Sequence, residues 1–290
     1  MAHIRGEIDE FIDRVRMLMG DRGRTLLDSD SLLVDAANRV AEQIFMDLLL
    51  PAETGYGEYS STITYVADQE YYSTPYGLLR MREVSVLDDD GLKCYDLDSI
   101  HRDEKHLRPG YWLEHDRVGI APIPDAADSD ALKLYYVRKP VPVHRGEAQA
   151  VTATSITLAK TAQLGRVLTR DNAYLGARVQ VIDATANEGE TAVVTAYVGS
   201  TCAATVAWDN TPTGTVTYEV MPDLPPEARG LWESMTAWQC LMDEDAGSSS
   251  KLTMLAASIE SQTRTLRNVA MTRVRTRTGP LGTVYGPEWV

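Results

Sequence analysis

Cysteine is scarce in this chain, and its copies are spread over separate segments. The 290 residues contain three, Cys94, Cys202 and Cys240. An odd and scattered set argues against a framework of disulfide bonds and against a cluster of thiolate metal ligands. We therefore expect all three to act as small apolar side chains.

Long hydrophobic runs are also missing. No apolar stretch approaches the roughly 18 residues that a membrane-spanning helix needs. The first residues, MAHIRGEIDEF, lack the apolar core of a secretory signal. With 44% hydrophobic and 24% charged residues, the composition is that of a globular chain, and its length predicts two or three domains. We expect a protein that is made and kept in a cytoplasm, without a membrane partner.

Positive charge is in short supply, with 28 basic against 42 acidic residues and a net charge of −14. This balance argues against binding DNA by neutralising its phosphates. The basic residues are unevenly placed, because five arginines and no carboxylate lie between Arg264 and Arg277. Two interpretations stay open. Cations are favoured at the C-terminus of a helix, and a basic surface is a docking site for an acidic partner.

Signatures of catalysis are absent from the sequence. It contains no Gly-x-Ser-x-Gly motif, no P-loop and no glycine fingerprint that follows a strand. Among 42 carboxylates, some pairs will lie at glycosidase distance by chance, so paired acids carry no information. A Ser–His–Asp arrangement of distant residues stays open, but nothing singles one out. We predict no enzyme, no catalytic residue and no cofactor.

Metal ligands at a useful spacing are missing too. His101, His106 and His115 match no zinc pattern, and a solvated polar loop is the simpler interpretation. The run from Asp88 to Gly91 lacks the alternating acids and terminal glutamate of a calcium loop, so it predicts a hairpin turn. We predict no metal site.

What is present is a strong helical pattern at both ends of the chain. Apolar residues recur at helical spacing in residues 4–19, 29–50, 227–245 and 249–275. Each segment has one apolar face, which must be buried against another element. Two segments at the front and two at the back suffice for one four-helix bundle built from both chain ends.

The middle of the chain has the pattern of β-structure. Four strand-like runs occur between Tyr59 and Arg138, namely STITYV, LRMREVSVL, RVGIAPIP and ALKLYYVRK. After a stiff linker at Lys139–Val143, short β-branched runs alternate with turn residues at the spacing of an all-β sandwich or barrel. A second proline-rich hinge, Pro222–Pro226, ends this part. The last fifteen residues are rich in glycine and proline and predict an extended arm.

These patterns predict an α+β protein with five segments. Residues 1–50 and 223–275 form the two halves of the helical bundle, and residues 51–146 form a β-strand region. Residues 147–222 form the inserted sandwich or barrel module. Residues 276–290 form the C-terminal arm.

Three stretches of the sequence resemble the head-to-tail connector (adaptor) proteins of tailed bacteriophages. They are LLDSDSLLVDAANRVAEQI, YYSTPYGLLRMREVSV and RVGIAPIPDAADSDALKLYYVRKP. In the last two, the matching residues are Tyr72, Pro75, Leu78, Leu79, Arg80, Met81, Val84, Ile120, Pro122, Pro124, Leu132, Leu134, Tyr135, Tyr136, Arg138 and Pro140. The inserted module resembles a β unit of phage structural proteins. The family usually continues from the Tyr-Tyr-x-Arg-x-Pro strand to its last helices, so the module is a departure from it.

The resemblance implies a structural protein of the virion. Such proteins form a ring, typically of twelve copies, between the portal at the capsid vertex and the tail. The ring extends the channel through which DNA passes without specific binding, and it offers a platform to the next tail or nozzle protein. The resemblance thus implies a homo-oligomer that assembles in the host cytoplasm and ends up at the head-to-tail interface.

Docking on the portal is expected from the C-terminal arm and the arginines before it. The residues of this hypothesis are Arg264, Arg267, Arg273, Arg275, Arg277, Leu281, Val284, Tyr285 and Trp289. Two other functions stay open. One is a tail-associated carbohydrate-binding or peptidoglycan-degrading protein that binds through the β module. The other is a stand-alone binding module unrelated to phage.

Overall fold

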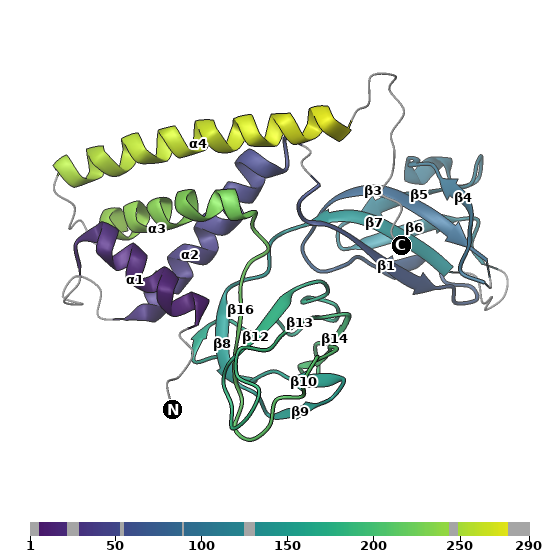
Figure 1. The fold of residues 1–290 in the computed structure, drawn as a ribbon. Helices are drawn as coiled ribbons and strands as arrows, with labels where there is room; N and C mark the ends of the chain where they lie inside the picture. Colours follow the sequence, from purple (N-terminus) through teal and green to yellow (C-terminus); the bar gives the residue numbers. More distant parts are fainter. Residues whose placement is uncertain are drawn as a thin grey trace. The chain divides into compact units, whose positions relative to one another are not determined.

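The chain contains α-helices and β-sheets and folds into two compact units (Figure 1). One unit is residues 57–139, and the other combines residues 1–56 with 140–290. A computed structural model describes residues 6–21, 29–52, 55–88, 90–124, 131–243 and 249–277, and of residues 131, 249 and 271–277 only the backbone.

The first two helices lie where the sequence pattern predicts them. Helix α1 spans Glu7–Met19 and ends at Gly20, whose positive φ of 73° is a left-handed conformation that glycine adopts without strain. Helix α2 spans Asp30–Ile44 and begins after Ser29, whose side chain accepts a hydrogen bond from the backbone of Ser31. The apolar stripe of each helix is buried.

Helix α2 continues into a short π-helix, which the periodicity did not predict. This element, η1, spans Phe45–Leu49 and ends just before Pro51. Phe45, Leu48 and Leu49 are buried, so the wider turn keeps the apolar face of α2 directed inward.

Helix α3 is the centre of the helical part. It spans Arg229–Asp243, follows a 3-10 turn η3 at Pro226–Ala228, and contacts each of α1, α2 and α4. Helix α4 spans Ser249–Arg277 and runs alongside α3 (Figure 1). The described part of the chain contains four α-helices, and none of them is long and apolar enough to cross a membrane.

The unit of residues 57–139 consists of two antiparallel sheets. One has the strand order β1-β7-β3-β4 and the other β2-β6-β5. Their bounds are β1 Glu58–Thr64, β2 Tyr71–Ser73, β3 Leu78–Leu87, β4 Lys93–Leu97, β5 Gly110–Glu114, β6 Arg117–Ala121 and β7 Ala131–Arg138, with a 3-10 turn η2 at Arg102–Glu104. Val84, Leu134 and Tyr136 lie in the core, and Tyr72 from the small sheet packs against them.

The inserted module contains two further antiparallel sheets, with strand orders β11-β8-β16-β12-β13 and β14-β15-β10-β9. The first of these sheets includes strand β8, so the module is taken from here on to begin at His144, three residues before the predicted bound. Their bounds are β8 His144–Glu147, β9 Ala150–Thr152, β10 Ser155–Thr157, β11 Leu164–Gly165, β12 Arg178–Asp183, β13 Thr191–Val193, β14 Ala196–Val198, β15 Ala203–Thr205 and β16 Thr217–Val220. The described strands form no closed barrel, so the barrel alternative is wrong. The short strands pair in two separate sheets instead.

The first and last strands of the module are direct neighbours. Strand β8 pairs with β16 along its length, with His144 opposite Val220 and Glu147 opposite Thr217. Chain entry and chain exit therefore lie side by side. Adjacent ends let a folded unit be inserted between two other segments without separating them.

The centre of the module is polar and fully buried. His144 lies between two tyrosines, with Nε2 3.2 Å from the hydroxyl of Tyr218 and Nδ1 3.3 Å from the hydroxyl of Tyr174. The hydroxyl of Tyr197 donates a hydrogen bond of 2.6 Å to the carbonyl of Leu168. These groups satisfy one another, as buried polar groups must.

Candidate functional site

A groove beside helix α4 contains two of the residues predicted to dock on the portal. Its volume is about 730 Å³, and it lies between the π-helix η1 and α4. Leu48, Pro51 and Ala52 give it an apolar part, and its lining is completed by Asp47, Glu260, Thr263, Arg264, Arg267 and Asn268. The groove therefore combines apolar surface with exposed charge.

Arg264 and Arg267 lie three residues apart, so they share one face of α4. Both are exposed. Arg264 pairs with Glu260 at 3.1 Å, with about three quarters of each side chain exposed. Exposed pairs of this kind contribute little to stability. Both guanidinium groups are therefore placed to bind carboxylates of a partner, for which their planar geometry is suited.

The remaining predicted docking residues are not among the described residues that line this groove. Arg273, Arg275 and Arg277 lie in the last two turns of α4, and nothing is described of their side chains. Leu281, Val284, Tyr285 and Trp289 lie outside the described residues. The first two residues of the predicted arm, Thr276 and Arg277, belong to α4.

Helix α4 leaves most of its surface exposed. Between residues 250 and 270, only Leu255, Leu266 and Ala270 are buried, and Met254 is 75% exposed. A small apolar pocket of about 250 Å³ lies between α3 and α4, lined by Met235, Trp238, Ala256, Ile259 and Glu260. Exposed apolar surface next to charged residues is typical of a protein-binding face.

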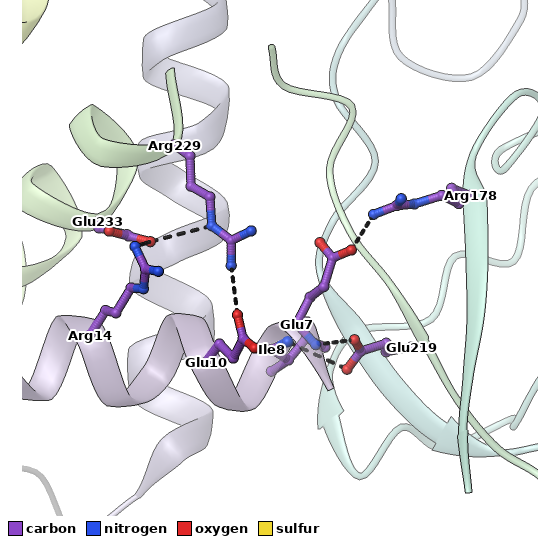
Figure 2. Close-up of polar contacts among 8 residues, drawn as sticks. All are labelled: Glu7, Ile8, Glu10, Arg14, Arg178, Glu219, Arg229 and Glu233. Carbon is purple, nitrogen blue, oxygen red and sulfur yellow. Dashed lines mark hydrogen bonds and ion pairs between the residues drawn. The ribbon is translucent and has the colours of Figure 1, made fainter. Parts of the chain in front are cut away.

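A second polar site joins helix α1 to the inserted module (Figure 2). Both oxygens of Glu219 accept hydrogen bonds from α1, at 2.5 Å from the backbone nitrogen of Glu7 and at 3.4 Å from that of Ile8. Arg145 bridges the two parts, because it binds Asp9 at 2.9 Å and Glu219 at 3.1 Å. Glu219 is completely buried.

Charged side chains extend this site along α1 to helix α3 (Figure 2). Arg178 of the module pairs with Glu7. Arg229 of α3 pairs with Glu10 at 3.7 Å and with Glu233 at 3.4 Å, and Arg14 also reaches Glu233. Acidic residues in the first turn of α1 thus meet basic residues from two other elements.

The electrostatics of Glu219 are a balance of opposing effects. Burial raises the pKa of its carboxyl group above the ordinary value, and the hydrogen bonds from Arg145 and from two α1 amides oppose this effect only in part. For Arg145, burial lowers the pKa, but Asp9 and Glu219 outweigh this effect and raise it. The two groups hold each other in the charged form, and removing one leaves the other buried without its partner.

The histidines considered as metal ligands do not form a cluster. His101, His106 and His115 are all exposed. No group of three or more His, Cys, Asp or Glu side chains in the described ranges is placed to hold a metal ion. Asp88 directly follows strand β3, and its side chain accepts hydrogen bonds from the backbone of Asp90 and Leu92, as in a hairpin turn.

Comparison with known proteins assigns the chain to a family. The sequence model of the family described as SU10 adaptor protein matches residues 7–159, which is more than half of the 290 residues. No curated protein matches the chain. The matched range begins at the first residue of α1, includes the whole unit of residues 57–139 and ends just after β10 of the module. The chain belongs to the SU10 adaptor family of phage head-to-tail adaptor proteins.

Proposed function

We propose that this protein is the subunit of a ring, typically of twelve copies, that joins the portal to the tail and extends the DNA channel. The observation that carries the proposal is the match to a structural phage adaptor family over residues 7–159. Members of such a family act by binding other head and tail proteins, and the family is not one of enzymes. The site of action is the virion, at the capsid vertex, after assembly in the host cytoplasm.

In this proposal, each segment of the chain has its own contact to make. Residues 1–50 and 223–275 act as one four-helix bundle, which makes the contacts between neighbouring subunits. Such contacts are heterologous, with one face of a subunit against a different face of the next. Residues 51–146 form the β-strand region. The two sheets of the inserted module form a sandwich that meets the tail or nozzle protein, and residues 276–290 reach the portal.

Portal docking uses the basic end of α4. The exposed pair Arg264 and Arg267 at the groove supports this part of the proposal, because the groove offers apolar surface and guanidinium groups together. Carboxylates of an acidic portal segment would pair with both guanidinium groups. The proposal also assigns to portal docking the residues Arg273, Arg275, Arg277, Leu281, Val284, Tyr285 and Trp289.

The negative net charge of the chain supports the proposal that DNA passes through the ring without being bound by it. At −14, the chain repels phosphate, and repetition in a ring multiplies the effect. DNA then passes through the lumen without specific binding.

Charge reversal at the groove tests the docking surface. The double substitution Arg264→Glu and Arg267→Glu is expected to weaken binding to purified portal rings at least about tenfold, because two attractive contacts become repulsive. Binding is measured by surface plasmon resonance, and assembly by negative-stain images of the mixture. The wild-type mixture is expected to show an added ring on the portal.

The matched control is Arg117→Glu, which changes another exposed arginine, on strand β6. It is expected to leave portal binding within about twofold of wild type. Equal affinity of the double variant and the wild type for the portal would show that Arg264 and Arg267 do not take part in docking. Failure of the wild type to form rings on any portal would contradict the ring itself.

A further inference from the structure

Helix α1 begins without a cap from its own sequence. Its N-cap residue is Gly6, in an extended conformation with φ −69° and ψ 156°. As a glycine, it has no side chain that could accept a hydrogen bond from the helix. The first backbone N–H groups of a helix have no partner within the helix and need an acceptor from elsewhere. Ser, Thr, Asp or Asn usually supplies it from the N-cap position.

The acceptor comes instead from the far end of the inserted module. The carboxylate of Glu219, in strand β16, receives the N–H groups of Glu7 and Ile8. More than 200 residues separate donor and acceptor in the sequence. A buried carboxylate at this place also interacts favourably with the positive end of the helix dipole.

Glycine at position 6 is what allows the carboxylate to approach. A Cβ atom there would lie within 3.0 Å of both Oε2 of Glu219 and an Nη atom of Arg145. A serine or aspartate at position 6 would therefore require the carboxylate of Glu219 to move from the position that it occupies. In this sequence the glycine leaves that position to the residue from the module.

The two strands that join the module to the helices provide the site together. Arg145 lies on β8 and Glu219 on β16, and the two residues are directly opposite each other in the sheet. Arg145 also binds Asp9 of α1. Chain entry and chain exit thus deliver an oppositely charged pair to one point on the first turn of α1.

We infer that Glu219, with Arg145, locks the inserted module onto helix α1, so that the helix depends on the module for its N-terminal cap. The module is then a fixed part of the subunit and not an appendage on two linkers. Its orientation toward any tail protein is set before assembly. This inference goes beyond the proposed function and holds whether or not the chain forms a ring.

Moving the carboxylate from the module to the helix tests the inference. Three variants of the full chain are compared with wild type: Gly6→Asp, Glu219→Ala, and both together. Hydrogen exchange of the α1 amides at residues 7–12 reports the cap. Cleavage by endoproteinase Asp-N before the exposed Asp223, in the segment Pro222–Pro226, reports whether the module stays docked.

Each single change is expected to raise exchange in α1, on the order of tenfold for Glu219→Ala, because the cap is lost. Gly6→Asp does so because its Cβ pushes the carboxylate of Glu219 out of position and the two neighbouring carboxylates repel each other, so that neither caps the helix well. In the double variant, the aspartate introduced at position 6 acts as the cap, and α1 exchange returns to within about twofold of wild type. Cleavage of the segment stays faster than in wild type, since the lock itself is not restored.

The direction in which Gly6→Asp changes α1 exchange distinguishes the two explanations. The substitution is expected to raise exchange in the wild-type background and to lower it in the Glu219→Ala background. A purely local role of Gly6 would change exchange in the same direction in both. Glu219→Gln keeps the shape and one acceptor oxygen, and it is expected to show a smaller increase of the same kind. Glu147→Ala, at an exposed glutamate of β8, is the control and should change neither readout.

Unchanged α1 exchange in both Glu219 variants would overturn the cap. A double variant that does not recover α1 protection would do the same. If the double variant recovers both readouts, other contacts hold the module, and the lock is overturned while the cap stands. None of these results depends on portal binding or ring formation, so they are separate from a failure of the proposed function.

Discussion

Replacing Trp232 with alanine is expected to lower the free energy of unfolding of the helical part by about 3–5 kcal/mol. Trp232 is 3% exposed, and its ring stacks on that of Phe11 with the centroids 3.9 Å apart. Its indole nitrogen donates a hydrogen bond of 2.8 Å to the carbonyl of Ala37. One side chain of α3 thus contacts both α1 and α2, and its loss leaves a large cavity and removes a hydrogen bond to α2.

The same change at Trp238 is the matched control, because it lies further along the same helix. Trp238 is half-buried and lines the small pocket between α3 and α4, so its removal is expected to cost about 1 kcal/mol. Urea unfolding followed by far-ultraviolet circular dichroism compares the two variants. Equal losses at both positions would show that Trp232 does not have the central role its contacts indicate.

The helices could be predicted from the sequence because their signals are local. Ser29 before α2 and Gly20 after α1 mark helix ends through their own side-chain and backbone chemistry. The apolar spacing of α1 and α2 follows directly from which residues are buried. The π-helix at Phe45–Leu49 could not be predicted in this way, because one wider turn hardly alters the spacing.

Strands with a weak pattern were missed. In strand β4, Lys93, Cys94, Tyr95 and Asp96 are all exposed. Because neither face is buried over these residues, its sequence lacks the alternation of apolar and polar residues that predicts a strand. It lies at the edge of its sheet, where only one side pairs. Its position also exposes Cys94, in contrast to the expectation of an apolar role, which Cys202 and Cys240 meet by being buried.

Of the two candidate sites, one could be predicted in part from the sequence and the other could not. The run of arginines in α4 is visible in the sequence, but its neighbours Leu48 and Pro51 come from a distant segment. Glu219 gave no signal at all. A glutamate in the strand TYEV is expected to face solvent, yet Glu219 is completely buried, because helix α1 covers its carboxylate. Tertiary contacts of this kind are not encoded in local periodicity.

The buried histidine of the module gives the second large effect, which is sensitivity to acid. His144 is surrounded by the hydroxyl groups of Tyr174 and Tyr218, which offer it no compensating charge. Burial lowers its pKa from 6.5 to about 4, and a hydrogen bond with the backbone of Pro142 only partly opposes the shift. The folded module therefore holds a neutral imidazole, with one ring nitrogen donating and the other accepting.

Between pH 6.5 and pH 4, the unfolded chain binds a proton at His144 that the folded chain does not. The contribution of this residue to stability is fully present above pH 6.5 and is lost as the pH falls toward 4. The loss over that range amounts to roughly 3 kcal/mol. It is measured as the free energy of urea unfolding of wild type and of His144→Gln, in steps of about half a pH unit from about pH 7.5 to about pH 4.5.

His144→Gln is expected to be less stable than wild type near neutral pH, because its amide replaces the ring imperfectly, but to lose much less stability on acidification. The two curves therefore converge as the pH falls. His115→Gln, at an exposed position, should leave the pH profile parallel to that of wild type. Parallel profiles for His144→Gln as well would mean that the imidazole gains its proton without unfolding the module, and that the polar centre of the module tolerates a charge.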